Sequence, residues 1–336
     1  MQRCNILFIC GSVNQTTMMV EIARHLVDHE CRFAPHYADG LMEAAARHGL
    51  LEWTIVGNRH RERAREVLRR HGCRIDDYGG QLDYDLVVTC SDLMLQQNIR
   101  SKPIVLVQEG MTDPETIMHK AVLSLGLPRY LASTSTFGLS NAYHTMCVAS
   151  EGYAEHFRRK GADGRKLRVT GIPNFDDCKR YTQISFEHRN YLLVATSDAR
   201  ETFKREDRRK TIEHALRIAD GRQVIFKLHP NELVGRATRE INRWAPEALV
   251  YHGCDINPMI AHCQALVTKF SSCVYVGIAL GKEVYSDFSM DELRRMCPVQ
   301  NGGRSGENIA QVCREILHER RLRLAVRHIT PSREAV

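Results

Sequence analysis

The sequence lacks any apolar run that approaches the ~20 residues of a membrane-spanning helix. Its opening stretch, MQRCNILFICG, has a short apolar core before Gly11, too short for the apolar region of a secretory signal, so we expect a first β-strand there. The 12 cysteines include no CxxC pair and no Cys/His ligand cluster. We therefore expect neither a zinc site nor a disulfide framework, and scattered free thiols favour a reducing cytoplasm.

Standard phosphate-binding loops are also missing. The glycine-led stretch GSVNQTT (11–17) is neither a Walker loop nor a GxGxxG fingerprint, so ATP-hydrolysing and NAD-dependent classes lose their usual support. No DxD-type acidic metal site stands in a convincing place, and the nearest acidic cluster, DFSMDE (287–292), is typical of a helix cap. We expect no metal and no cofactor.

The charge balance is moderately basic. The 47 Lys and Arg residues outnumber the 40 Asp and Glu residues, which gives a net charge of +7 and indicates anionic ligands or an anionic surface. Acids are interspersed in the basic runs and aromatic residues are absent from them, so these runs are typical of solvated helix faces and predict no nucleic-acid partner.

Short apolar runs alternate with amphipathic helical patterns along both halves of the chain. The runs lie at 5–10, 31–37, 85–90, 103–108 and 145–150, and then at 191–197, 223–228, 248–253, 265–270 and 283–288. This alternation predicts an α/β protein with parallel sheets covered on both faces. The 336 residues suit two doubly wound, Rossmann-like domains facing a cleft, joined by the polar linker 171–190.

We place an N-terminal, acceptor-side domain at 1–175, a C-terminal nucleotide-donor domain at 176–320 and a C-terminal helix or tail at 321–336. The segment from Ser305 has an apolar helical face formed by Ile309, Val312, Cys313 and Ile316. Its basic end could contact the inner face of an anionic membrane peripherally, although a solvated terminal helix is the commoner outcome.

Ligands of doubly wound sheets bind where the strands end, so the residues after each run are the candidates. In the first loop these are Gly11, Ser12, Asn14 and Gln15, because free N–H groups at a helix start favour an anion. A plain helix cap by one of the neighbouring threonines explains the same loop equally well.

In the second half, the run VIFKL ends in His229-Pro230. Proline keeps His229 extended, so its imidazole should project from the strand end on the same face as Lys227. Ser271 and Ser272 follow another run and offer hydroxyls and N–H groups to an anion. The alternatives are that the histidine and the serines are ordinary helix caps.

Two carboxylates stand at strand ends of the first half. Glu109, beside Gly110, is suitably placed as a general base, and Asp92 is the second candidate. The alternative for each is a solvated loop acid.

The assembled motifs resemble the GT-B superfamily of nucleotide-sugar enzymes, over about residues 80–290. The segment SEGYAEHFRRKGADGRKLRVTGIPNFDD (150–177) resembles UDP-N-acetylglucosamine 2-epimerases, and Asp92 and the QEG at 108–110 fall where that family has GD and EAG motifs associated with catalysis. KLHP (227–230) and TKFSSCVYVGIALGKEVY look more like the CDP-glycerol glycerophosphotransferases and bacterial sialyltransferases, in which such HP and paired-serine motifs hold nucleotide phosphates.

The sequence also departs from both patterns. The first loop lacks the arginine of the epimerases, SDARE (197–201) stands in place of their HRxEN, and KFSSC in place of their DSGG. Gln108 replaces the first acid of the sialyltransferase motif, which leaves Glu109 as the shared carboxylate.

Together these features predict a metal-independent glycosyltransferase, or polyol-phosphate transferase, in cell-surface polysaccharide or glycolipid synthesis. Its partners would be a nucleotide-activated donor and a glycan or lipid-linked acceptor. Glu109, or failing it Asp92, would be the base, and Lys227, His229, Ser271 and Ser272, with Ser197 and Gly171, would hold the nucleotide and its phosphates. The alternatives are a sugar-nucleotide epimerase or hydrolase and a non-catalytic binding protein, and the oligomeric state stays open.

Overall fold

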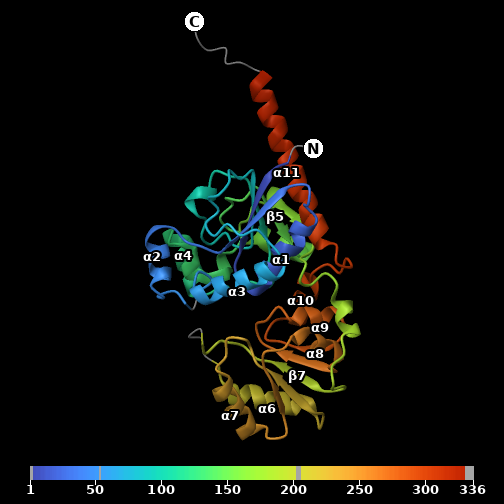
Figure 1. The fold of residues 1–336 in the computed structure, drawn as a ribbon. Coiled ribbons are helices and arrows are strands. Elements are labelled where there is room, and N and C mark those ends of the chain that lie inside the picture. Colours follow the sequence, from blue (N-terminus) through green and yellow to red (C-terminus); the bar gives the residue numbers. More distant parts are fainter. Residues whose placement is uncertain (1–2, 53, 202–205, 330–336) are drawn as a thin grey trace. The chain divides into compact units, whose positions relative to one another are not determined.

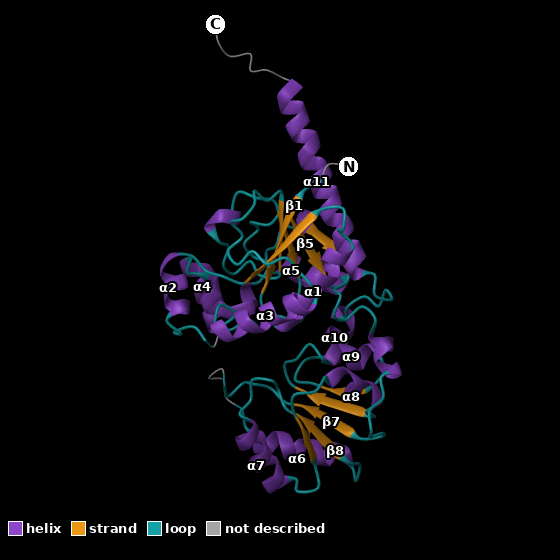
Figure 2. Cartoon of the chain, in the orientation of Figure 1, coloured by secondary structure: helices purple, strands orange, loops and turns teal. Residues whose placement is uncertain are grey.

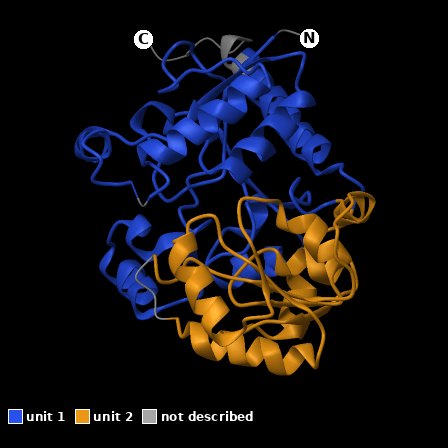
Figure 3. Cartoon of the chain, turned by 60° about the horizontal axis from the view of Figure 1, so that its bottom comes forward, with its two compact units in different colours: residues 1–176, 301–336 blue, residues 177–300 orange. Residues whose placement is uncertain are grey.

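The computed structural model describes residues 3–52, 54–201 and 206–329. The chain forms two compact units (Figures 1 and 3). The first comprises Met1–Asp176 and Asn301–Val336, and the second comprises Asp177–Gln300. Each unit is built around its own parallel sheet.

The first unit contains a six-stranded parallel sheet in the order β2-β1-β3-β4-β5-β6. Its central strands are short, fully buried runs rich in Val, Ile and Leu, as expected of strands that are covered on both faces. The strands are β1 (Asn5–Cys10), β2 (Glu30–Pro35), β3 (Leu86–Thr89), β4 (Ile104–Val107), β5 (Thr145–Val148) and β6 (Leu167–Val169). The carboxyl ends of β1, β3 and β4 are adjacent in this order, which brings the loops after them together.

The helices of the first unit connect these strands, and α11 returns to the unit from the end of the chain. They are α1 (Val13–Arg24), α2 (Gly40–Arg47), α3 (Asn58–Arg70), α4 (Ile117–Leu125), α5 (Glu151–Arg159) and α11 (Ser305–Ile329), with 3₁₀ turns η1 (Gln97–Ile99), η2 (Arg129–Thr136) and η3 (Gly164–Lys166). No helix within the described ranges is both long and apolar enough to cross a membrane.

The second unit contains a five-stranded parallel sheet in the order β11-β10-β7-β8-β9, with helices on both faces (Figure 2). Its elements are η4 (Cys178–Gln183), β7 (Leu192–Ala195), α6 (Arg208–Ala219), β8 (Val224–Lys227), α7 (Val234–Trp244), β9 (Leu249–Tyr251), α8 (Ile256–His262), β10 (Ala265–Thr268), α9 (Val274–Ala279), β11 (Glu283–Tyr285) and α10 (Met290–Met296). The carboxyl ends of β10, β7 and β8 are neighbours at one edge of the sheet.

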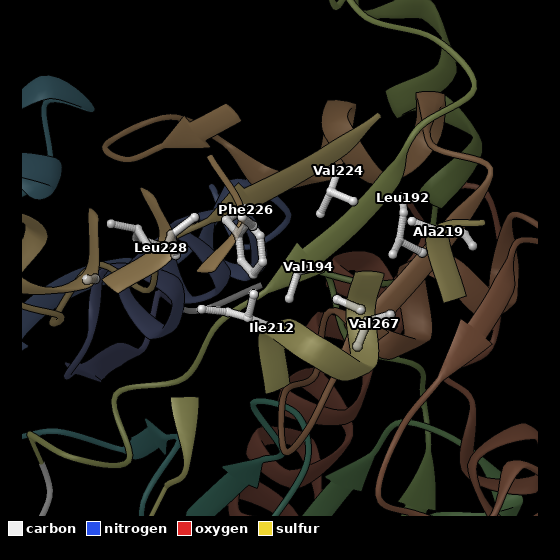
Figure 4. Close-up of a cluster of buried hydrophobic side chains, with 13 residues drawn as sticks. Leu192, Val194, Ile212, Ala219, Val224, Phe226, Leu228 and Val267 are labelled. Carbon is white, nitrogen blue, oxygen red and sulfur yellow. The ribbon is translucent and has the colours of Figure 1, made fainter. Parts of the chain in front are cut away.

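The two faces of this sheet carry different helices. Figure 4 shows Leu192, Val194, Phe226 and Val267 packed with Ile212 of α6, so alternate residues of β7, β8 and β10 point to the face covered by α6 and α7. The intervening residues point to the opposite face, because successive strand side chains alternate. On that face Leu266 of β10 and Val284 of β11 lie directly against Gly277 of α9.

The predicted fold class is confirmed: both sheets are entirely parallel and both are covered by helices. All ten predicted runs contain a strand of the structure. The additional strand β6 was not predicted, because LRV is short and two of its residues are exposed, so the segment has no apolar run.

The end of the chain differs from the predicted division, which placed 176–320 in the second domain. The described contacts put 301 onward with the first unit, since Ile309, Cys313 and Ile316 of α11 are buried and α11 packs against α1. Arg314 also donates to the backbone oxygen of His25. The sequence placed the start of α11 in the second domain because the apolar face of this helix gives no indication of which sheet it covers. Of the predicted helix or tail at 321–336, residues 321–329 belong to α11, and 330–336 lie outside the described residues.

Candidate functional site

The first group of candidate residues lies where β1 and β4 end in the first unit. Ser12 caps α1 by accepting from the Gln15 N–H, and its hydroxyl donates to Glu109 Oε1 at 2.9 Å. Gln15, in the first turn of α1, donates through Nε2 to Glu109 Oε2 at 2.6 Å. Two residues of the predicted first loop therefore hold the two oxygens of the predicted base.

This loop leaves no room for a side chain at Gly11. A Cβ atom there would lie 2.0 Å from Gln15 Oε1 and 2.3 Å from Ile55 Cδ1. Glycine is required by this close approach, since any larger residue would displace the glutamine that orients Glu109. Asn14 is exposed, and its backbone oxygen accepts from the Asn174 side chain at 3.3 Å, so it does not contact the carboxylate.

Burial sets the protonation behaviour of Glu109. The residue is half-buried, and desolvation raises the pKa of its carboxyl group, although the hydrogen bonds from Gln15 and Ser12 act in the opposite direction. A carboxylate with a raised pKa is a stronger proton acceptor than a solvated one. Glu109 thus differs physically from the solvated loop acid of the alternative interpretation.

Gln108, which replaces an acid of the family motif, has a positioning function. Its side chain is fully buried, donates through Nε2 to the Gly110 oxygen at 2.8 Å and accepts at Oε1 from the Ala149 N–H at 2.9 Å. A carboxylate could accept from Ala149 but would repel the Gly110 oxygen. An amide is therefore the side chain that fixes the turn carrying Glu109, which the sequence showed only as a departure from a motif.

Asp92, the second candidate base, is a buried and extensively paired carboxylate in this geometry. Its side chain is 1% exposed and pairs with the Arg129 guanidinium at 2.8 Å. Its carboxylate also accepts from the Gly138 N–H at 2.9 Å and the Ser140 N–H at 3.1 Å. These contacts favour a structural role for Asp92, and the sequence did not indicate them because a strand-end position does not reveal whether distant N–H groups will occupy the carboxylate.

We expect Asp92→Ala to lower the free energy of unfolding by about 2–4 kcal/mol, because it removes the carboxylate that pairs with Arg129 and that accepts from the Gly138 and Ser140 N–H groups. Urea titration followed by circular dichroism measures this change. Glu115→Ala, which removes a half-exposed carboxylate with only loose ion pairs, is the matched control and should change the stability little. An Asp92→Ala protein as stable as the parent would contradict the structural role.

In the second unit, His229 follows β8 and is half-exposed. Its Nδ1 accepts from the Asn231 N–H at 3.2 Å and lies 3.6 Å from Asp198 Oδ2. With Nδ1 accepting, the neutral ring carries its proton on Nε2, which makes that nitrogen the donor. The imidazole can therefore offer an N–H to an anion while its backbone is fixed by other contacts.

Those contacts form a buried ionic network that sequence reasoning missed. The Glu232 side chain is fully buried; its Oε2 accepts from the His229 N–H at 3.0 Å and from the Thr196 hydroxyl, and its Oε1 accepts from Arg208. Arg208, 3% exposed, also pairs with Glu206 at 3.2 Å. The network ties the ends of β7 and β8 to the start of α6. The only sequence signal was the acid three residues after His229.

Lys227 points to the opposite face of the sheet from α6. It is 5% exposed, its ammonium donates to the Leu228 oxygen at 2.9 Å, and burial lowers its pKa. Its charge acts on Asp255, the cap of α8, and on Cys273, just before α9. Lys227 is thus within electrostatic range of the segment that contains the predicted serines.

Ser271 and Ser272 are both half-buried at the start of α9. The Ser271 hydroxyl accepts from the Cys273 N–H at 3.4 Å, which is the capping contact of the alternative interpretation. The backbone oxygens of the two serines accept from Val274 and Tyr275. These contacts form the first turn of the helix, which begins shortly after the end of β10.

Ser197 lies in a pocket of about 370 Å³ at the ends of β7, β10 and β11. The residues that line this pocket do not include Lys227, His229 or either serine. The structure therefore separates Ser197 from the other predicted phosphate-binding residues of the second unit.

Gly171, proposed as a nucleotide-binding residue, belongs to the first unit, as the predicted domain boundary at 175 implied. Its φ is +75°, and a Cβ atom there would lie 2.2 Å from Ser305 Oγ at the start of α11. This glycine allows the chain to pass close to the returning terminal helix. Its requirement for glycine is explained by packing.

No model of a protein family matches the chain, and no curated protein matches its sequence. Solved structures do match in fold. UDP-GlcNAc 2-epimerase from Neisseria meningitidis, bound to UDP-GlcNAc, is similar with a TM-score of 0.56 at 12% identity, over 93% of this chain and 100% of that chain. The S. aureus MnaA–UDP structure has a TM-score of 0.57 at 13% identity, over 95% and 89% of the two chains.

The wall teichoic acid polymerase TagF is also similar, with a TM-score of 0.51 at 11% identity, over 94% of this chain and 89% of that chain. Both branches named from the motifs, the epimerases and the glycerophosphate-transferring enzymes, thus recur among the structural neighbours. At these identities the likeness concerns the fold. The chain has the two-domain GT-B fold that these nucleotide-sugar and teichoic acid enzymes share.

Proposed function

We propose that this protein transfers a glycosyl or polyol-phosphate group from a nucleotide-activated donor to an acceptor hydroxyl. The observation that carries the proposal is Glu109, a half-buried carboxylate with a raised pKa at the end of β4, oriented by Ser12 and Gln15. The structural neighbours support the nucleotide-linked donor, because the Neisseria meningitidis epimerase is bound to UDP-GlcNAc and the S. aureus MnaA protein to UDP.

In the proposed reaction, Glu109 accepts the proton of the acceptor hydroxyl as that oxygen attacks the donor. The first unit would bind the acceptor, a glycan or a lipid-linked molecule, and the reaction would serve cell-surface polysaccharide or glycolipid synthesis in the cytoplasm. Gln15 and Ser12 keep the carboxylate fixed, so little reorganisation is needed when the proton moves.

The second unit would stabilise the departing nucleotide phosphate. The Lys227 ammonium and the Nε2–H of His229 supply charge and a donor, and the hydroxyls of Ser271 and Ser272 supply further donors. These groups can neutralise a phosphate without a metal ion. Glu232 would act indirectly, by fixing the backbone at His229.

An epimerase or hydrolase on the same fold is the main competing function, and a non-catalytic binding protein is the other. An epimerase or hydrolase would change the donor with no acceptor present, whereas a binding protein would change no donor at all. The residues SDARE and KFSSC, which stand where the epimerases have other motifs, favour transfer over epimerisation.

Thermal denaturation of the full chain with UDP, CDP, CMP or GDP, and their sugar or polyol derivatives, tests the proposed donor. A nucleotide at 100 times its dissociation constant should stabilise the protein by about 2.7 kcal/mol and raise its melting temperature by several degrees. His229→Ala should reduce this shift, while His318→Ala, an exposed histidine on α11 of the first unit, serves as the control. Equal shifts in His229→Ala and the parent would refute the phosphate-binding role of His229.

A further inference from the structure

The pocket that contains Ser197 lies on the α6 side of the second sheet. Val194 of β7 and Val267 of β10, which line it, belong to the core cluster that packs against α6. Lys227 alternates with these residues and points to the other face. The pocket is therefore distinct from the phosphate-binding groups of the proposed reaction.

Cationic side chains reach this pocket from two elements. Lys210 and His214 are four residues apart in α6, so their side chains lie on one side of that helix. Lys269 follows β10 and is half-buried. Ammonium groups on both sides of one hollow favour a ligand that carries a phosphate.

The remaining walls fit the rest of such a ligand. Val194, Val267 and Met290 provide apolar contacts for a ring, and the exposed carboxylate of Asp287 can accept hydrogen bonds from sugar hydroxyls. Ser286 donates to the Lys269 oxygen at 3.0 Å, which joins the ends of β10 and β11 into one wall. The pocket volume of about 370 Å³ is in the lower range for small-molecule sites.

We propose that this pocket binds a phosphorylated sugar or mononucleotide, as a second ligand site beside that of the transferred donor. Lys210 and Lys269 would contact the phosphate and Asp287 a ring hydroxyl. The site would be occupied independently of His229, because His229 is not among the residues that line the pocket.

Calorimetric titration of the full chain with UMP tests this site. We expect a binding event that persists in His229→Ala and that weakens about tenfold or more in Lys269→Glu and in Lys210→Glu, as for the loss of a hydrogen bond between charged groups. Arg217→Glu is the matched control, because it makes the same change of charge on an exposed position of α6 outside the pocket and should retain the parent affinity.

Three results would overturn the inference: no such event at millimolar UMP, an event unchanged by Lys269→Glu, or equal weakening by Arg217→Glu. Each of these leaves the proposed transferase function intact, because that function depends on Glu109 and His229. Conversely, loss of donor binding in His229→Ala with the UMP event unchanged would separate the two sites directly.

Discussion

Glu109→Gln is expected to reduce turnover of a nucleotide-activated donor by about 10²- to 10⁴-fold, the usual contribution of a positioned general base. The amide keeps the shape of the side chain and can accept from Gln15 or Ser12, but it cannot take the acceptor proton. Donor binding should change little, because the proposed phosphate contacts belong to the second unit. Steady-state rates and a donor titration together measure both effects.

The same substitution should raise the stability of the protein at neutral pH. Because burial raises the folded-state pKa of Glu109 above its unfolded value, the folded state favours the protonated carboxyl, and this contribution is lost as the pH rises through the folded-state pKa. Glutamine stays neutral throughout. The melting temperature of Glu109→Gln should exceed that of the parent at pH 7, and the difference should shrink at acidic pH.

Glu115→Gln is the control for both measurements, because Glu115 lies in the loop after Glu109 and its carboxylate is 48% exposed. It should retain the parent rate and show no comparable pH-dependent gain in stability. A Glu109→Gln protein with the parent rate would exclude Glu109 as the base. A lower melting temperature at pH 7 would contradict the burial argument.

Glu232→Ala is expected to have the largest effect on folding. It removes the carboxylate that binds Arg208, the Thr196 hydroxyl and the His229 N–H, and it leaves a guanidinium that is 3% exposed with Glu206 as its remaining carboxylate partner among the described residues. Breaking a buried ion pair in this way costs about 3–5 kcal/mol. The midpoint of urea unfolding should fall accordingly.

A double-mutant cycle with Arg208→Met measures the interaction free energy between Glu232 and Arg208 apart from their other contacts. Because Glu232→Leu leaves the buried Arg208 charge without this carboxylate, and Arg208→Met leaves the buried Glu232 carboxylate without its cation, the double variant Glu232→Leu/Arg208→Met should lose less stability than the sum of these two single variants. Glu213→Ala on the exposed side of α6 should leave the stability almost unchanged. Additive losses of unfolding free energy in the cycle would show that Glu232 and Arg208 do not stabilise each other.

The architecture could be predicted from the sequence because buried parallel strands produce continuous apolar runs with polar ends. The stretch VIFKL, for example, contains β8 and correctly placed His229 just beyond a strand. Ser12, Gln15 and Glu109 were each singled out as strand-end residues, but their contact with one another was not predicted. The order of the strands within each sheet, in contrast, could not be predicted from the sequence.

Long-range pairing accounts for what the sequence did not reveal. Asp92 looked like a free strand-end acid until the structure placed Arg129 and two N–H groups around it. The return of α11 to the first unit and the role of Glu232 depend likewise on contacts between distant segments. Local periodicity identifies a buried face but not its partner.

The most direct test of the proposed function compares one active donor with and without an acceptor. After the thermal screen identifies the nucleotide, its glycosyl and polyol-phosphate derivatives are incubated with the parent protein and a set of hydroxylated glycans and lipid-linked sugars. Released nucleotide is measured by anion-exchange chromatography, and the modified acceptor by mass spectrometry. Acceptor-dependent release together with an extended acceptor is the result that transfer predicts, whereas epimerised or hydrolysed donor at the same rate without acceptor would contradict it.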